Sequence, residues 1–443
     1  MIRPNAHSIE SLETLIQRNR RGKGGGITSV CSANPQVLEA AAREAAGAGT
    51  ILCVESTSNQ VNQFGGYTGL KPAGFVALVR NITERAGLAR EQLLLGGDHL
   101  GPYPWRKEPA ASAMEKACEL VRLCVAAGYS KIHADASMNC AGDPAGPLDE
   151  KVIAERSALL AKAAEEAHSD VSGGPAPRYI VGTEVPVPGG EQAAGEPPSV
   201  TRPQDVARTI ELARSAFAGQ GLQDAWSRVI GLVVQPGVEF GDAVVFDYDP
   251  GKTRELVAAL PPDPQLSYEA HSTDYQTGGA LRRMVLDHFA ILKVGPWLTF
   301  AFREAVFALS AVEREWLGGR RGAAVSQVRE ALEQAMLQNP EYWRPYYTGS
   351  DEDLRFARAF SYSDRCRYYW PQPAVQAELE KLWNNLTTST PPSTLLSQYL
   401  PAEYEAVRAG TIANEPKALV QERVRRVLRT YAAACEPVGQ SSD

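Results

Sequence analysis

The sequence predicts an α/β protein built as a (β/α)8 barrel with a helical C-terminal extension. Short apolar runs rich in β-formers alternate regularly with helical patterns, there are eight such runs, and they stop before residue 315 of the 443. Regular alternation of strand and helix favours parallel strands covered by helices. Eight such units over about 300 residues favour a closed barrel over an open sheet. We therefore expect a barrel over 1–315 and an extension over 316–443 that packs on it.

The expected strands are short, and each is followed by a loop and then by a segment with helical periodicity. In chain order they are Gly26–Ala33, Thr50–Ser56, Leu93–Gly101, Lys131–Ser137, Tyr179–Pro186, Ile230–Gly237, Gln265–Ser272 and His288–Pro296.

Helix start and stop residues agree with this division. Asn34 is expected to cap a helix that begins at Pro35 and ends near Gly47–Gly49. Thr201 and Pro203 are expected to begin another. The further expected helices are Ala111–Gly128 and Leu148–His168 in the barrel, and Val325–Gln338, Val375–Leu386, Tyr399–Ala409 and Leu419–Ala434 in the extension.

Composition excludes several classes of protein. Hydrophobic residues make up 44% and charged residues 22% of the chain, as in an ordinary globular protein. The net charge of −7 gives no support to nucleic-acid binding. The seven cysteines form no CxxC pair, which favours reduced thiols in the cytoplasm over a disulfide framework. We find no signal-peptide core and no apolar run of about 18 residues that could span a membrane.

Polar residues lie at the C-terminal ends of the expected strands, where barrels of this class carry their active sites. Seven of the eight strands end in ionisable or amide residues. Burying so many charges without partners is costly, so we expect them to form a functional site. The ionisable residues concerned are Glu55, Asp98, His99, Asp135, Glu184, Glu269, His271 and Lys293.

The expected metal ligands are His99, Glu184 and His271. Imidazole nitrogens with a carboxylate oxygen suit Zn²⁺ or Mn²⁺, and three protein ligands leave positions for substrate oxygens. His133 is either a further ligand or an inward-packing residue, and it shares a strand face with Asp135. The alternative is that these histidines are neutral, hydrogen-bonded core residues.

The candidates for proton transfer are Asp98, Glu55 and Asp135. Asp98 immediately precedes His99, so the two side chains start on opposite faces of a regular strand. At a strand end the chain can turn enough to bring both to the site. Asp98 could then move protons beside a metal held by His99.

The candidate substrate-binding residues are polar side chains at or after strand ends. They are Asn59, Gln60, Gln235, Ser272, Asp274 and Lys293. Lys293 could also form a Schiff base, but a buried lysine that is paired with Glu269 or Asp135, or that contacts the substrate, is the favoured interpretation.

Two further segments leave alternatives open. Gly65–Gly69 is either a phosphate cradle of backbone N–H groups or a tight turn. Arg365–Trp370, in the extension, mixes basic and aromatic residues, and it either folds over the barrel mouth or packs between helices.

Longer motifs run through almost the whole chain. They are Val30–Ala33, Glu55–Val61, Gln63–Gly69, Gly96–Pro102, Gly182–Gly190, Val234–Phe240, Glu269–Thr277, Tyr362–Arg365 and Arg367–Pro371. Together they closely resemble the GatZ/KbaZ family, the Z subunit of class II D-tagatose-1,6-bisphosphate aldolase.

The resemblance implies a barrel related to class II aldolases, in which a divalent ion polarises the ketose carbonyl. Asp98 and His99 look like the aspartate and metal-binding histidine of the third strand, and His271 looks like the ligand of the seventh. Gln235 stands where the catalytic aldolases use a histidine. The glycine-rich phosphate cup is also replaced, by His271–Asp274. Both departures argue against autonomous bisphosphate-aldolase activity.

The resemblance leaves three functions open. The first is a supporting subunit for a catalytic Y-type subunit, in a homo- or hetero-oligomer. The second is a metal-dependent 4-epimerase of ketohexoses or their phosphates, as in some relatives. The third is a tagatose-6-phosphate kinase, a label given to some members, and the absence of a GxxxxGK[ST] phosphate loop argues against it.

Overall fold

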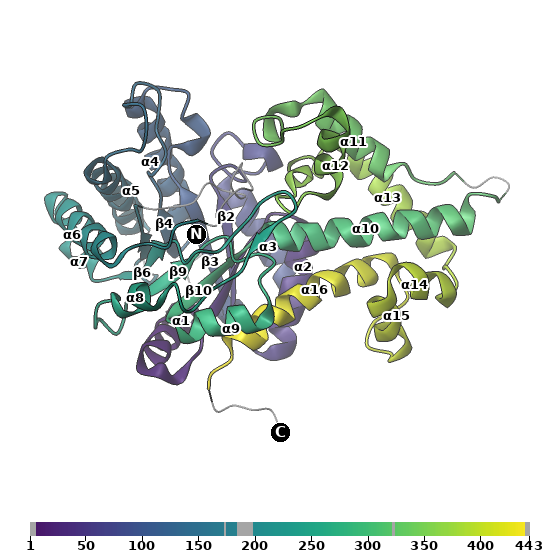
Figure 1. Ribbon diagram of the computed structural model, residues 1–443, viewed down its shortest axis with the longest axis horizontal. Helices are drawn as coiled ribbons and strands as arrows, with labels where there is room; N and C mark the ends of the chain where they lie inside the picture. The colour runs from purple at the N-terminus through teal and green to yellow at the C-terminus, as the bar shows by residue number, and fades with distance from the viewer. Residues whose placement is uncertain (1–5, 172–173, 184–197, 321–323, 439–443) are drawn as a thin grey trace.

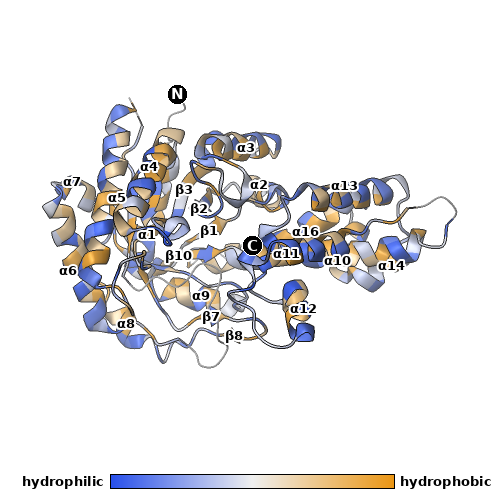
Figure 2. Cartoon of the chain, turned by 90° about the horizontal axis from the view of Figure 1, so that it is seen from above, coloured by the Kyte–Doolittle hydropathy of each residue, from blue (hydrophilic) through white to orange (hydrophobic). Residues whose placement is uncertain are grey.

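Eight parallel strands close into a barrel, in the order β1-β10-β9-β6-β5-β4-β3-β2 (Figure 1). The structure is a computed structural model, and it describes residues 6–171, 174–183, 198–320 and 324–438. Helices cover the outside of the barrel, and in Figure 2 their apolar and polar residues lie on different faces. The expected (β/α)8 barrel with C-terminal helices is confirmed.

Each barrel strand overlaps the run expected for it. The strands are β1 (Ile27–Cys31), β2 (Leu52–Thr57), β3 (Leu93–Leu100), β4 (Lys131–Ala134), β5 (Arg178–Val181), β6 (Val229–Val234), β9 (Ser267–Ala270) and β10 (Phe289–Val294). A small antiparallel pair that the sequence pattern did not predict, β7 (Glu239–Phe240) with β8 (Val245–Phe246), follows the sixth barrel strand.

The helices account for most of the remaining described chain. Those of the barrel are α1 (Ala6–Arg18), α2 (Pro35–Ala48), α3 (Pro72–Arg85), α4 (Ala110–Ala127), α5 (Glu150–Asp170), α6 (Pro203–Gly219), α7 (Gln223–Trp226), α8 (Arg254–Ala258), α9 (Gly278–Leu286) and α10 (Pro296–Leu317). The rest are α11 (Val328–Gln338), α12 (Asp351–Phe360), α13 (Pro373–Thr388), α14 (Ser393–Tyr399), α15 (Pro401–Arg408) and α16 (Pro416–Cys435).

Of the two helix starts expected at Asn34 and Thr201, one is capped as expected and the other is not. Asn34 caps α2 as expected, because its side chain accepts from the backbone N–H groups of Gln36 and Val37. Thr201 does not cap α6; its hydroxyl instead accepts from the backbone N–H of Gln235 and ties the helix entry to the end of β6.

The helix expected over Tyr399–Ala409 is present as α15, and a further helix that the sequence pattern did not predict, α14, comes directly before it. Helix α14 ends at Tyr399 and α15 begins at Pro401. Proline has no N–H to continue the hydrogen-bond ladder and is well suited to the first helical position, so it separates the two.

Helix α1 closes one end of the barrel. Its buried Ile9, Leu12 and Ile16 belong to one apolar cluster with residues of the barrel strands, among them Leu94 and Ile230. This apolar plug fills the N-terminal half of the interior and leaves polar side chains to the other half.

The extension packs against the barrel through its last helix. Helix α16 contacts α2, α9 and α10, and in Figure 1 α10 and α16 run side by side beyond the barrel with the other extension helices around them. The eighth strand is followed by α10, which continues to Leu317, so the expected boundary at 315 falls in its last turn. No helix in the described part of the chain is both long and apolar enough to cross a bilayer.

Candidate functional site

Side-chain alternation along the strands stacks a layer of charges beneath a layer of histidines inside the barrel. Residues two apart on a strand share a face. Lys131 therefore lies below His133 on β4, and Glu269 lies below His271, just past the end of β9. All four side chains are buried. The sequence pattern thus places a charged layer between the apolar plug and the mouth of the barrel.

The charged layer is a closed set of ion pairs. Lys131 Nζ lies 2.6 Å from Glu55 Oε1 and 2.7 Å from Glu269 Oε2. Lys293 Nζ contacts Glu55 Oε2 and lies 3.0 Å from Asp98 Oδ1. Gly96 makes room for this layer, since a Cβ there would meet Glu55 Oε1 at 2.9 Å. Buried charges are tolerated when each has partners, as these do.

Three imidazoles and one carboxylate converge above this layer. The ring centroids of His99, His133 and His271 lie 4.9–5.1 Å from one another. His99 Nε2 is 3.2 Å from His271 Nδ1 and 3.8 Å from Asp98 Oδ2. Asp98, His99, His133 and His271 each offer a ligand atom, and these atoms lie within 4.8 Å of one another. We call these four residues the histidine cluster.

A bulge in β3 brings Asp98 and His99 to the same side. The pairing of β3 with β4 shifts between Gly97 and Leu100, and His99 has a φ of 47°. A left-handed residue at a bulge re-aims the side chains that follow a regular strand. The turn that was expected to bring the two side chains together is therefore present.

Each histidine of the histidine cluster is oriented by a carboxylate. His99 Nδ1 lies 2.7 Å from Asp135 Oδ2, and His271 Nε2 lies 3.0 Å from Glu269 Oε1. His133 Nδ1 lies 3.0 Å from Asp98 Oδ1. Hydrogen bonds from the second ring nitrogen to a carboxylate are typical of histidines that bind metals.

The charges of the site shift the pKa values of its members. Burial disfavours the charged form of His99, but Asp98 and Asp135 overcome it and raise the pKa of His99 to about 9. Burial by itself would raise the pKa of Glu269, but Lys131 and His271 bring it down to about 2. The imidazoles likewise hold the pKa of Asp98 well below its usual range. The carboxylates are therefore ionised and available as acceptors or ligands.

The histidine cluster fits a divalent cation. Nitrogens at about 2.1 Å from a tetrahedral Zn²⁺ are roughly 3.4 Å apart, close to the separation of His99 Nε2 and His271 Nδ1. His133 Nε2 is buried and has no hydrogen-bond partner among the described residues. A buried imidazole nitrogen without a partner is costly unless something binds it.

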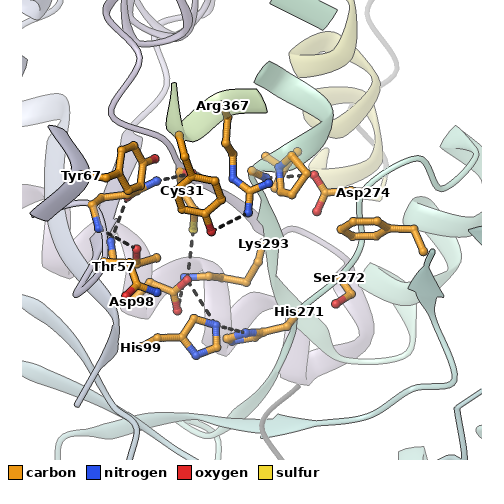
Figure 3. Close-up of a pocket in the computed structure, with 17 residues that line it drawn as sticks. Cys31, Thr57, Tyr67, Asp98, His99, His271, Ser272, Asp274, Lys293 and Arg367 are labelled. Carbon is orange, nitrogen blue, oxygen red and sulfur yellow. Dashed lines mark hydrogen bonds and ion pairs between the residues drawn. The ribbon is translucent and has the colours of Figure 1, made fainter. Parts of the chain in front are cut away.

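A pocket opens above the histidine cluster and is drawn in Figure 3. Asp98, His99 and His271 lie on one side of it. Five of the six expected substrate-binding residues also line it, namely Asn59, Gln60, Ser272, Asp274 and Lys293.

The other predicted residues lie elsewhere. Glu55 and Asp135 are buried behind the pocket wall, where they contact Lys131 and His99. Gln235 turns into its own loop, since its Oε1 accepts from the N–H of Gly237. Glu184 lies outside the described residues.

Residues of the extension complete the pocket. Arg367 and Tyr368 line it, which agrees with the mouth-covering alternative for this part of Arg365–Trp370. Arg365 in the same segment is buried against the ring of Tyr346. The mixture of basic and aromatic residues was the only sequence signal for this contribution.

The Gly65–Gly69 segment forms a turn. The N–H groups of Phe64 and Gly66 donate to Asn62 Oδ1. Gly66 also packs closely on the preceding chain, since a Cβ there would meet the carbonyl oxygen of Gln60 at 2.4 Å. The N–H groups of Gly65 and Tyr67 donate to the carbonyls of Asn62 and Asn59, so three N–H groups of the segment are already bonded.

Comparison with known proteins places this site in a family. The sequence profile described as "D-tagatose-1,6-bisphosphate aldolase subunit GatZ/KbaZ-like" matches residues 12–436. The "D-tagatose-1,6-bisphosphate aldolase subunit GatZ" of Salmonella newport is 48% identical over 426 residues, which cover 96% of this chain and 99% of the relative. The same-named protein of Salmonella enteritidis is equally similar, with the same coverage.

A solved structure agrees with this assignment. The crystal structure of a "probable tagatose 6 phosphate kinase" from Sinorhizobium meliloti superimposes with a TM-score of 0.83 and 44% identity, over 93% of this chain and 100% of that one. On these grounds the chain belongs to the GatZ/KbaZ-like family.

Proposed function

We propose that this chain is the Z-type subunit of a class II D-tagatose-1,6-bisphosphate aldolase and supports a catalytic Y-type subunit in sugar-phosphate metabolism. The observation that supports this proposal most strongly is the 48% identity of the chain, over nearly the full length of both chains, to proteins named as that subunit. Gln235, in place of the histidine that the catalytic aldolases use, agrees with a supporting role.

We further propose that the histidine cluster holds one divalent ion, Zn²⁺ or Mn²⁺. The ligands would be His99, His133, His271 and Asp98, with Glu184 a candidate outside the described residues. Bound there, the ion would supply Lewis-acid polarisation of ketose oxygens. The donor set and the unpartnered His133 Nε2 support this assignment.

The protein groups around the ion have separate proposed roles. Asp98 is placed to exchange a proton with a sugar hydroxyl, because it is ionised and lines the pocket. Lys293 contacts Asp98 and Glu55, which favours a charge-positioning role over a Schiff base. Asn59, Gln60 and Ser272 would orient sugar hydroxyls, and Asp135 would orient His99.

A cytoplasmic location is part of the proposal. All seven cysteines are free in the structure, as expected in a reducing compartment.

The subunit proposal is tested by reconstitution. The chain is co-expressed with a Y-type aldolase subunit, and the complex is isolated through a tag on one partner. Stable co-purification, together with a rise in the aldolase rate and heat stability of the Y-type subunit, is the expected result. A Y-type subunit that neither binds this chain nor gains activity would contradict it.

A second candidate function is a metal-dependent 4-epimerase of ketohexoses or their phosphates. The observation in its favour is the complete buried cluster, which a purely supporting subunit would not require. Asp98 would remove the C4 hydroxyl proton as the C3–C4 bond opens. The aldehyde then turns over, the bond re-forms, and the proton returns to the C4 oxygen.

The epimerase candidate is tested with the purified chain alone. With Mn²⁺ or Zn²⁺ it is incubated with fructose- or tagatose-type sugars, free and phosphorylated, and the C4 epimer is quantified. Formation of the epimer that is lost in Asp98→Asn supports it, and no turnover with any of these sugars contradicts it. An added-ATP arm distinguishes a sugar-phosphate kinase.

A further inference from the structure

Arg367 brings a positive charge from the extension to the pocket wall. Its Nη1 donates to the backbone carbonyls of Ser363 and Asp364, and its Nη2 lies 3.1 Å from the hydroxyl of Tyr368. Its partners among the described residues are thus carbonyls and a phenol, and no ion pair to a described carboxylate neutralises it. In Figure 3 it lies across the pocket from His99 and His271.

Two buried arginines nearby, Arg303 and Arg358, are neutralised by carboxylates, whereas Arg365 is buried without one and stacks on the ring of Tyr346. Arg303 Nε lies 2.8 Å from Asp364 Oδ1, and Arg358 Nη2 lies 2.6 Å from Glu333 Oε1. Burying a guanidinium without a carboxylate is costly. Arg367 differs from Arg365 because it is only partly buried and lines the pocket, so its charge is available to an anion that enters the pocket from solution.

Asp274 is an acidic pocket residue whose pKa is affected by the charge of Arg367. Its carboxyl already accepts two hydrogen bonds. Its Oδ1 accepts from the N–H groups of Gly295, at 3.0 Å, and Trp297, at 2.8 Å. Burial, opposed by these bonds and by Arg367, still raises the pKa of Asp274 to about 6. Since the carboxyl is bound to these two N–H groups and forms no ion pair with Arg367 among the described residues, it does not act as the counter-ion of Arg367.

Tyr368 gives the guanidinium a rigid neighbour with a polarised hydroxyl. Its ring stacks on Tyr342 at 4.7 Å and meets Tyr67 edge-on at 4.6 Å. Burial opposes ionisation of the hydroxyl, but Arg367 and Arg365 outweigh it and lower the pKa of Tyr368. A phenol with a lowered pKa is a stronger hydrogen-bond donor to an anion.

The segment that carries both residues is fixed to the barrel. Asp242, beside the β7–β8 pair, accepts from Ser361 Oγ at 2.8 Å and from the N–H of Tyr362 at 2.9 Å. The Tyr275 hydroxyl donates to the carbonyl of Tyr362 at 2.6 Å. Asp364, in the same segment, has a φ of 46° and forms an ion pair with Arg303. Preorganisation of this kind is typical of a binding site.

We propose that Arg367 and Tyr368 form an anion subsite that binds the terminal phosphate monoester of a ketohexose phosphate, while the ketose end faces the histidine cluster. The proposal rests on the proposed function, because that function supplies the sugar. A guanidinium fork matches the oxygens of a phosphate and is the preferred group for such recognition. In this arrangement the extension contributes directly to substrate selection.

The test measures binding to the isolated full chain by calorimetry. The probes are a ketohexose 6-phosphate, the same ketohexose without phosphate, and inorganic phosphate. Arg367→Gln should weaken binding of the phosphorylated sugar by about 10- to 100-fold, as expected for loss of a charge-assisted contact. The affinity for the neutral sugar should change by less than about twofold. Arg367→Lys and Tyr368→Phe should give smaller losses of the same selectivity, and inorganic phosphate should no longer bind Arg367→Gln.

Arg365→Lys is the matched control, because Arg365 belongs to the same segment but lies outside the pocket. It should leave the ratio of the two sugar affinities unchanged. If Arg367→Gln does not fold, Arg367→Lys and Tyr368→Phe still test the ratio, since both keep most of the local contacts.

Three results would overturn the proposal. The first two are an equal loss of affinity for both sugars in Arg367→Gln and no loss of affinity for either. The third is tighter binding of a hexuronate than of the ketohexose phosphate, which would assign the subsite to a carboxylate. Binding is read without a Y-type subunit, so failure here is distinct from failure of the reconstitution.

Discussion

His99 donates through Nδ1 to Asp135 Oδ2 at 2.7 Å, and this contact leaves Nε2 of the same ring facing His271 Nδ1 at 3.2 Å. One carboxylate thus fixes both the tautomer and the direction of the imidazole. His99 Nε2 points to where the second imidazole and Asp98 also converge. This is the carboxylate–histidine arrangement that raises the basicity of a metal ligand.

Asp135→Ala should weaken metal binding by about 10- to 100-fold, because loss of an orienting carboxylate typically has that effect. Affinity is measured by competition with a chromophoric chelator on metal-free protein. Ser137→Ala is the control, since it removes only a hydroxyl that donates to Asp135 Oδ1 at 2.6 Å. The loss of metal affinity in Ser137→Ala should be several-fold smaller than in Asp135→Ala. Equal losses would mean that the contact of Asp135 with His99 does not determine the metal affinity.

His133→Ala should reduce bound metal as severely as His99→Ala, at least about 100-fold in affinity, because we assign His133 as a ligand of the same ion. Metal content after dialysis is measured by mass spectrometry. His168→Ala is the control, because His168 lies in the last turn of α5. Full metal content in His133→Ala would leave His133 as a packing residue only.

Lys131→Met should destabilise the protein by about 3–5 kcal/mol, because Glu55 and Glu269 would remain buried without the positive charge of Lys131. The free energy of unfolding is measured in urea, with the circular dichroism of the helices as the signal. Arg43→Ala, which breaks the exposed pair with Glu39, is the control and should change it by less than about 1 kcal/mol. Equal effects would contradict a structural role for the charged layer.

Asp274→Asn should stabilise the protein increasingly as the pH rises from about 4 to 6. The folded-state pKa of Asp274 is raised from 3.8 to about 6, so its contribution to stability is complete below 3.8 and is lost as the pH rises through 6. Asparagine has no such loss, and the difference should grow by at most about 3 kcal/mol. Unfolding in urea at pH 4, 5, 6 and 7 measures it.

The exposed Asp224, replaced by asparagine, controls for the loss of a surface charge. A difference between wild type and Asp274→Asn that stays constant across this pH range would contradict the raised pKa of Asp274.

The barrel could be predicted because its strands are buried on both faces and read as apolar runs. Their ends were visible because charged residues interrupt those runs at Glu55, Asp98 and His271. Helix α1 was not predicted, since the pattern Ile9, Leu12, Ile16 is short and its role as a plug depends on contacts with distant strands.

The composition of the site was harder to predict than its position. Whether Asp98 and His99 share one side depends on a bulge in β3, which follows from pairing with β4 and not from local propensity. Lys131 reads as a strand-initial lysine in the sequence, and only the closed barrel brings it against Glu55 and Glu269. Arg367 reaches the pocket from more than seventy residues beyond β10, a separation that no local pattern reveals.

The most direct test of the central claim is anomalous diffraction from crystals of metal-free protein soaked in Zn²⁺. The account predicts one strong peak per chain within about 2.1 Å of His99 Nε2 and His271 Nδ1, with Asp98 and His133 completing the ligands. No peak at this position, with His99 and His271 still in direct hydrogen-bond contact while zinc binds elsewhere, would contradict it.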